Sequence, residues 1–299
     1  MKTIQQFVSE IKEGRQLTLA RALTLVENDL SESSSILKAI DIDLSIPVIG
    51  VTGPPGAGKS TLVNAMIDHL SNQSKKVAIL AVDPTSPFNL GSLLGDRIRM
   101  SAHFNNPDVF IRSIATRGSV GGLSAKIIEM VDVLRAAAFD YIIVETVGVG
   151  QSEIEIAGLA DITLVVLVPE AGDEIQHIKS GLMEIGDAFI VNKSDREGAD
   201  SFANKLKKML HQRLALTPVF KTVAEKKEGI AMLIDWINQS GMKRNDKRLF
   251  LYTEKAYKIL QNIRMRDINR QRLHDDLSCV IDKPGFNLYQ FAAGYLNNI

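Results

Sequence analysis

Short apolar runs alternate with longer helical stretches through the middle of this 299-residue chain. The runs are rich in Val and Ile and are apolar on consecutive residues, which is typical of strands buried on both faces of a parallel sheet. They lie at 47–51, 77–82, 109–114, 141–144, 162–168, 188–191 and 219–223. The helical stretches lie at 61–70, 124–138, 174–185, 201–214 and 230–238. The alternation predicts an α/β fold with a doubly wound, mostly parallel sheet and helices on both faces.

Both ends of the chain have a different, helical pattern. Residues 2–30 carry apolar side chains at helical spacing, which predicts one or two amphipathic helices, and a polar break at 31–35 ends this region. Beyond Gly241, a charged helical run spans 247–275 and a last amphipathic stretch spans 286–296. We therefore expect an N-terminal helical extension at 1–45, the α/β domain at 46–241, and a C-terminal helical arm at 242–299. The apolar stripe of this arm could pack within the chain or on a partner helix, as in a dimer.

A glycine-rich segment at 53–60 directly follows the first predicted strand and directly precedes a predicted helix. It fits G-x-x-x-x-G-K-[ST] at every fixed position, and its residues are Gly53, Pro54, Pro55, Gly56, Ala57, Gly58, Lys59 and Ser60, followed by Thr61. Glycines let the backbone curl so that successive N–H groups point at phosphate oxygens, and the positive end of the helix adds to this attraction. The segment predicts the phosphate site of a P-loop NTPase, in which Lys59 bridges the β and γ phosphates and Ser60 binds Mg²⁺.

A second polar segment follows the predicted strand 188–191, at the end where doubly wound sheets bind ligands. Its residues are Asn192, Lys193, Ser194 and Asp195. We expect the Asp195 carboxylate to accept both the ring N–H and the exocyclic amine of guanine, a pair of donors that adenine lacks. Asn192 could bond the base edge or hold the loops together, and the stem of Lys193 could lie across the ring. Thr222, Val223 and Ala224 end the last predicted strand and could add a backbone N–H to the guanine oxygen. The predicted ligands are therefore GTP and GDP.

Carboxylates at other predicted strand ends could hold Mg²⁺ or register the γ-phosphate. Asp83 closes the run 77–82, Asp96 lies in the loop that follows, and Glu145 closes the run 141–144. Many P-loop enzymes carry D-x-x-G where Glu145 and Gly148 stand, so the N–H of Gly148 could meet the γ-phosphate. No glutamine directly follows Gly148. Hydrolysis is therefore expected to be slow until a partner supplies or orders a group.

Composition argues against several kinds of partner and site. Lys+Arg and Asp+Glu balance at 35 each, so charge gives no reason to expect nucleic acid or a membrane surface as a partner. The apolar runs are far shorter than the roughly 20 residues that cross a bilayer. The single cysteine, Cys279, cannot form an internal disulfide, and the first residues lack the apolar run of a secretory signal, so we expect a cytoplasmic protein. The five histidines lack the spacing of a zinc or nickel site.

Together these motifs resemble the MeaB or ArgK type of P-loop GTPase, a family associated with adenosylcobalamin-dependent methylmalonyl-CoA mutase. The resemblance rests on the segments 53–61, 83–88, 94–96, 116–118, 121–123, 145–153, 171–176 and 192–195. The string E-T-V-G-V-G-Q-S-E at 145–153 is highly specific. The resemblance implies a homodimeric, GTP-hydrolysing chaperone that gates cofactor loading and protects the mutase during turnover.

The resemblance also implies roles for individual residues. It places Asp83, Asp96 and Glu145 around Mg²⁺ and the γ-phosphate, and it suggests that Lys179 could reach the site when a partner orders its loop. Two other functions stay open, a metallochaperone GTPase that inserts nickel and a small-molecule kinase that uses the same phosphate loop. The missing Cys and His cluster counts against the first, and the guanine-reading segment counts against the second.

Overall fold

The computed structural model describes residues 3–83, 100–115, 126–146, 152–169, 180–213, 217–240, 246–265, 268 and 270–296. The chain divides into two compact units, Met1–Asn245 and Asp246–Ile299. The whole sheet belongs to the first unit.

The first unit is built on a seven-stranded sheet in which all neighbouring strands are parallel. The strands are β1 (Val48–Thr52), β2 (Val77–Asp83), β3 (Val109–Ala115), β4 (Tyr141–Glu145), β5 (Ile162–Leu167), β6 (Ala188–Val191) and β7 (Val219–Lys221). Their order across the sheet is β3-β2-β4-β1-β5-β6-β7. Each predicted apolar run forms one of these strands, so the doubly wound parallel sheet is confirmed.

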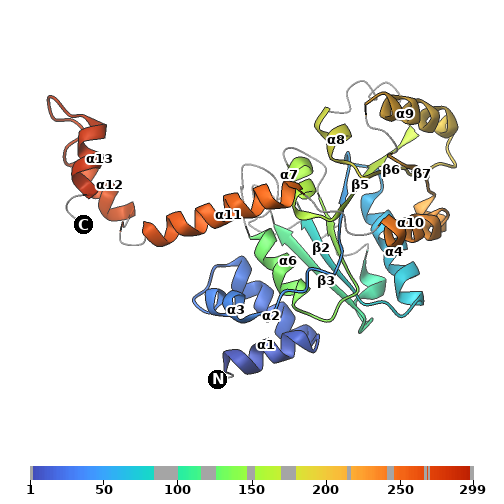
Figure 1. The fold of residues 1–299 in the computed structure, drawn as a ribbon, viewed down its shortest axis with the longest axis horizontal. Coiled ribbons are helices and arrows are strands. Elements are labelled where there is room, and N and C mark those ends of the chain that lie inside the picture. The colour runs from blue at the N-terminus through green and yellow to red at the C-terminus, as the bar shows by residue number, and fades with distance from the viewer. Residues whose placement is uncertain are drawn as a thin grey trace. The chain divides into compact units, whose positions relative to one another are not determined.

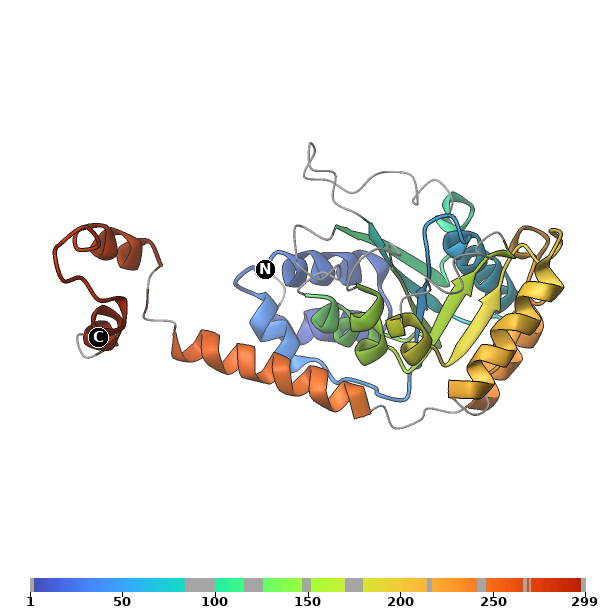
Figure 2. The same cartoon turned by 90° about the horizontal axis from the view of Figure 1, so that it is seen from above.

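Helices cover both faces of the sheet (Figure 1, Figure 2). Successive residues of a strand point to opposite faces, and Ile49 and Val51 of β1 join the buried cluster formed with α4 (Lys59–Asn72) and α10 (Ile230–Ser240). The α-hydrogen position of Gly50 that a side chain would take faces the other side of the sheet, where α7 (Ser152–Leu159) packs very closely. A Cβ on Gly50 would lie 2.5 Å from Cγ1 of Ile156. Every residue of β1, β4, β5 and β6 is buried, as the continuous apolar runs predict.

The other described connections of the sheet are mostly helical, with ends that differ from the predicted ones. They are η1 (Ser101–His103), α6 (Ile127–Arg135), α8 (Ser180–Ile185), α9 (Ala199–Arg213) and η4 (Ala224–Lys226). The last strand is shorter than the predicted run 219–223, because β7 ends at Lys221. Val223 forms an antiparallel bridge with Glu228 instead, so the chain turns back on itself directly after the strand.

Strands β1 and β5 lie at the topological switch point of the sheet. The chain leaves β1 toward β2 and leaves β5 toward β6, which lie on opposite sides of the β1–β5 pair. In open α/β sheets, ligands bind beyond the carboxyl ends of the strands at such a point. This edge of the sheet is therefore where a binding site is expected.

Three helices precede the sheet in the first unit. They are α1 (Ile4–Lys12), α2 (Gln16–Glu27) and α3 (Ser33–Ala39). Thr3 begins α1 with a capping box that includes Gln6. Helices α2 and α3 pack against α6, and Arg112 of β3 forms a 2.6 Å ion pair with Glu27 of α2. These contacts join the N-terminal helices to the sheet within one compact unit.

The polar segment 31–35 was expected to end the N-terminal helical region, and this expectation was wrong, because α3 begins at Ser33. Ser33 and Ile36 are both buried in this helix. The intrinsic helix propensity of a residue contributes little to the free energy of folding. The packing of α3 against its neighbours therefore outweighs the poor helix propensity of serine.

The second unit contains α11 (Asp246–Arg264), α12 (Arg270–Ser278) and α13 (Leu288–Leu296). The predicted helical run 247–275 is thus divided between two helices. The ring centroid of Phe291 lies 6.3 Å from that of Phe286 and 5.6 Å from that of Tyr295. Helix α11 exposes several large apolar side chains, and they are Leu249, Phe250, Tyr257, Ile259, Leu260 and Ile263. Within the described residues, no helix has both the length and the apolar character needed to cross a membrane.

Candidate nucleotide site

The glycine-rich segment 53–60 forms a tight turn between β1 and α4. Gly53, Gly56 and Gly58 have φ angles of 139°, 78° and 85°, which side chains with a Cβ rarely adopt. A Cβ on Gly53 would lie 2.1 Å from the carbonyl oxygen of Val166 in β5. Helix α4 begins at Lys59, so the N–H groups of its first turn lie at the end of this loop. The turn has the form of an anion-binding loop.

Lys59, Ser60 and Glu145 bring polar groups together beside this loop. The Lys59 ammonium is buried and donates to the carbonyl oxygens of Gly53 at 3.0 Å and Pro54 at 3.1 Å. The Ser60 hydroxyl donates to Oε1 of Glu145 at 2.6 Å. Glu145 is the last residue of β4, and it is paired in register with Val51 of β1. The parallel pairing of β1 and β4 therefore places the carboxylate against the first turn of α4.

Asp83 is the last residue of β2, the other neighbour of β4. Its backbone is therefore at the same edge of the sheet as Glu145, as predicted. Its side chain lies outside the described residues, as do the predicted site residues Asp96, Gly148 and Lys179.

Asn192 ties three loops together at this edge. Its Nδ2 donates to the carbonyl oxygen of Ala57 in the glycine-rich loop at 3.0 Å. Its Oδ1 accepts from the Thr222 hydroxyl and from the backbone N–H of Ala224, both at 3.1 Å. Asn192 is 2% exposed, so these bonds are shielded from water. Of the two roles predicted for Asn192, its side chain here fills that of holding the loops together.

Lys193 and Asp195 lie in the same group of loops, on its more exposed side. Lys193 has a φ of 54°, and its ammonium donates to the carbonyl oxygen of Gly56 at 3.0 Å. The two residues line a cavity of about 190 Å³, whose lining residues are Gly58, Thr61, Asn192, Lys193, Asp195, Arg196, Val223, Ala224 and Glu225. The structure thus brings the end of the glycine-rich loop, the 192–195 segment and the 222–224 segment around one cavity.

The Asp195 carboxylate has a lysine partner within this loop cluster. Nζ of Lys226 lies 3.0 Å from Oδ2 of Asp195, and both side chains are about half exposed. The hydrogen bond from Lys226 holds the pKa of Asp195 below its usual value, and the same contact raises the pKa of Lys226. Asp195 is therefore a charged acceptor at neutral pH.

The loop that carries Lys226 is fixed to the rest of the site. Val223 and Glu228 exchange two backbone hydrogen bonds of 3.2 Å, which close the loop around η4. Lys227 directly follows Lys226, and its Nζ lies 2.9 Å from Oδ2 of Asp68 in α4. Oδ1 of Asp68 in turn lies 3.4 Å from Nε2 of the buried His103. Helix α4 thus supports the glycine-rich loop at one end and the 222–228 loop further along.

A model of the family described as methylmalonyl Co-A mutase-associated GTPase MeaB matches residues 19–275 of the chain. The chain belongs to the MeaB family of GTPases. It is therefore an enzyme that hydrolyses GTP, and the family, the P-loop fold and the activity predicted from the sequence are confirmed.

Individual relatives agree with the MeaB family assignment. A protein of Pyrococcus horikoshii is 40% identical over 300 residues, which cover 95% of this chain and 94% of the relative. A protein of Caenorhabditis briggsae named methylmalonic aciduria type A homolog, mitochondrial, is 38% identical over 209 residues, which cover 64% of this chain and 51% of the relative. A crystal structure of a LAO/AO transport system kinase has a TM-score of 0.69 and 27% identity, and the match covers 96% of this chain and 94% of that chain.

Sequence reasoning missed three residues of this candidate site. Arg196 and Glu225 line the cavity, and Lys226 bonds the carboxylate of Asp195. Arg196 directly follows Asp195, so its position next to a recognised motif was an available signal. The pairing of Lys226 with Asp195 had no such signal, because it depends on how two loops from different strands meet.

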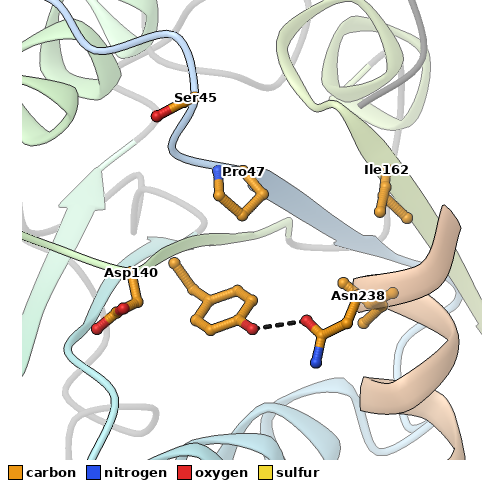
Figure 3. Close-up of a pocket in the computed structure, with 7 residues that line it drawn as sticks. Ser45, Pro47, Asp140, Ile162 and Asn238 are labelled. Atoms are coloured by element: carbon orange, nitrogen blue, oxygen red, sulfur yellow. Dashed lines mark hydrogen bonds between the residues drawn. The ribbon is translucent and has the colours of Figure 1, made fainter. Parts of the chain in front are cut away.

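A second cavity of about 260 Å³ lies at the opposite edge of the sheet, beside the amino ends of β1, β4 and β5 (Figure 3). It is lined by Ser45, Pro47, Asp140, Tyr141, Ile162, Ile237 and Asn238. The Tyr141 hydroxyl donates to Oδ1 of Asn238 at 2.6 Å, and burial raises the pKa of Tyr141. This lining shares no residue with the cavity beside Asp195.

Proposed function

We propose that the loops at the carboxyl edge of the sheet form the GTP site, with the phosphates on residues 53–60 and guanine beside Asp195. The observation that carries this proposal is the bonding of Asn192, which holds the glycine-rich loop and the 222–224 segment together. A bound nucleotide would need both loops at once, because one binds its phosphates and the other its base. Gly53, Pro54, Pro55, Gly56, Ala57, Gly58, Lys59, Ser60 and Thr61 would surround the phosphates.

The donor set beside the loop fits Mg²⁺. This ion prefers oxygen ligands, and the Ser60 hydroxyl and the Glu145 carboxylate lie in direct contact. Ser60, Glu145, Asp83 and Asp96 would hold the ion, directly or through water. When bound, Mg²⁺ would neutralise charge on the β and γ phosphates. Lys59 would add a second positive group to the same phosphates. The N–H of Gly148 would meet the γ-phosphate, and Lys179 would reach the site in the presence of a partner.

Base selection is the first test of this site. With Mg²⁺, the purified protein should turn over GTP at least about a hundredfold faster than ATP at low substrate concentration, because the Asp195 carboxylate matches the two donors of guanine. The measurement is kcat/KM for each nucleotide by phosphate release. Comparable values for GTP and ATP would refute the guanine site.

For the biological role, we propose that this GTPase acts in the cytoplasm as a chaperone for an adenosylcobalamin-dependent mutase of the methylmalonyl-CoA type. The description of its family names that mutase, and the name of the C. briggsae relative refers to methylmalonic aciduria. The GTP-bound state would gate cofactor loading and protect the mutase. The helices of residues 246–299 would join two copies into a homodimer.

The mutase proposal predicts that the client changes the rate of GTP hydrolysis. Adding a purified methylmalonyl-CoA mutase should raise kcat at least about tenfold, because a partner can supply or order a group at the γ-phosphate. A nickel enzyme of the same organism is the matched control. Stimulation by the nickel enzyme and none by the mutase would favour the metallochaperone function instead.

A further inference from the structure

Lys226 contacts the one carboxylate that the proposed site uses to read the base. Its Nζ lies 3.0 Å from Oδ2 of Asp195 and donates a hydrogen bond to it. Asp195 lines the cavity, whereas Lys226 is absent from the residues that line it. The ammonium therefore reaches the carboxylate from outside the space in which a base would lie.

The backbone of Lys226 is held in place from several directions. Its N–H donates to the carbonyl oxygen of Val223 at 2.9 Å within η4. At the start of η4, the N–H of Ala224 donates to Asn192, and after it Lys227 pairs with Asp68. Little backbone freedom has to be lost when the Lys226 side chain bonds Asp195. The anchored backbone thus keeps the Lys226 ammonium within reach of the carboxylate, where it provides a nearby reference point.

An aspartate needs such a reference point, because the last torsion of its side chain has a broad preference. Guanine offers two parallel N–H donors, and both are satisfied only when the carboxylate plane is correctly turned. A carboxylate has about four lone-pair positions, so Oδ2 can accept from Lys226 and still accept from a base. The lysine and the base need not compete for this oxygen.

We propose that Lys226 is a positioning residue for guanine selectivity, which turns the Asp195 carboxylate so that both of its oxygens meet the base. This inference rests on the proposed assignment of Asp195 to guanine. It adds a residue from a separate loop to the recognition of the base. Lys226 touches neither the base nor the reacting phosphates in this role.

The proposal predicts a loss of affinity that depends on the exocyclic amine of guanine. Lys226→Met should raise the Kd for GDP about threefold to fivefold, the range of an exposed, charge-assisted pair. IDP lacks that amine and offers one donor, so its Kd should rise less and the preference for GDP over IDP should shrink. Saturating kcat for GTP should stay within about twofold, since the phosphates are not touched. Lys226→Arg should restore most of the affinity and the preference.

A matched control is available in the same part of the chain. Lys221 forms an exposed ion pair with Asp200 at 2.6 Å, and neither residue lines the cavity. Lys221→Met removes the same charge and should leave both Kd values unchanged. Competition against a fluorescent GDP analogue measures these values, and circular dichroism confirms that each variant is folded.

Asp195→Ala separates a failure of the inference from a failure of the site. In that background, adding Lys226→Met should have no further effect on the Kd for GDP. If Asp195→Ala itself leaves the affinity for GDP unchanged, the proposed guanine site is wrong. If Asp195→Ala weakens binding but Lys226→Met does not, or weakens GDP and IDP equally, only the role of Lys226 is overturned. Tighter binding of GDP by Lys226→Met would also overturn it, because the lysine would then compete with the base.

Discussion

Asn192 shows how much of the proposed site depends on the side chain of one buried residue. Its amide donates to Ala57 and accepts from Thr222 and Ala224, so it joins loops that follow β1, β6 and β7. An amide has both donors and acceptors, which no carboxylate or alkyl side chain of similar size can match. Removing it would leave three buried polar groups without that partner.

Asn192→Ala should lower the free energy of unfolding by about 2 kcal/mol and weaken GDP binding at least about tenfold, because buried groups lose their bonds and the loops separate. Urea denaturation and GDP titration measure the two effects. Asn238→Ala is the control, since Asn238 accepts a partly buried hydrogen bond from Tyr141 at the far edge of the sheet. That variant should lose some stability and keep its affinity for GDP. An equal loss of affinity in both variants would contradict the role of Asn192.

At the scale of elements, the close packing of β1 against β5 constrains the backbone of the turn that connects β1 to α4. Gly53 leaves β1 with a φ of 139°, and its α-carbon lies against the backbone of β5 at Val166. Neither the φ angle nor the space tolerates a side chain. The turn that creates the phosphate loop is therefore set by the β1–β5 pair as well as by the loop itself.

Gly53→Ala should reduce stability by about 2 kcal/mol or more, since the backbone must shift away from Val166, and it should abolish measurable GDP binding. Thermal unfolding and GDP titration are the measurements. Gly14→Ala provides the comparison, because Gly14 has a φ of 75° and no atom within 4 Å of an added Cβ. It should cost about 1 kcal/mol through backbone strain alone and leave binding intact. Normal GDP binding by Gly53→Ala would show that the loop tolerates the shift.

How far the sequence predicts these elements depends on what holds each one. The strands were found because burial on both faces leaves a continuous apolar run, and the glycine-rich loop because its backbone requires glycine. Helix α3 was missed because tertiary packing stabilises its serine-rich start. β7 was predicted too long, since Val223 bridges to Glu228 rather than extending the sheet. The contact between Asp195 and Lys226 depends on the arrangement of two loops, which no local pattern encodes.

At the scale of the whole molecule, the two compact units differ in how far they bury their apolar side chains. Strands and helices of the first unit bury a large apolar core, whereas α11 of the second unit exposes Leu260 at 59% and Ile263 at 63%. Exposed apolar side chains grouped on one element often mark a site of association. This is the physical support for the homodimer proposed above.

If α11 forms the dimer contact, Leu260→Glu combined with Ile263→Glu should convert a dimer to a monomer, because two charges would have to be buried at the interface. Sedimentation velocity over a range of protein concentrations gives the molar mass. Gln261→Glu adds a charge to the same helix at an exposed polar position and should leave the dimer intact. A monomeric wild-type protein at all concentrations would rule out the proposed association.

Helix α4 begins at the phosphate loop, and its Asp68 holds Lys227 of the loop beside the base cavity. This one helix therefore sets the distance between the phosphate loop and the loop beside the base cavity. Guanine should occupy one position whether two or three phosphates are present. The difference between GTP and GDP would then be confined to the phosphate end of the site, while the base end would serve as an anchor.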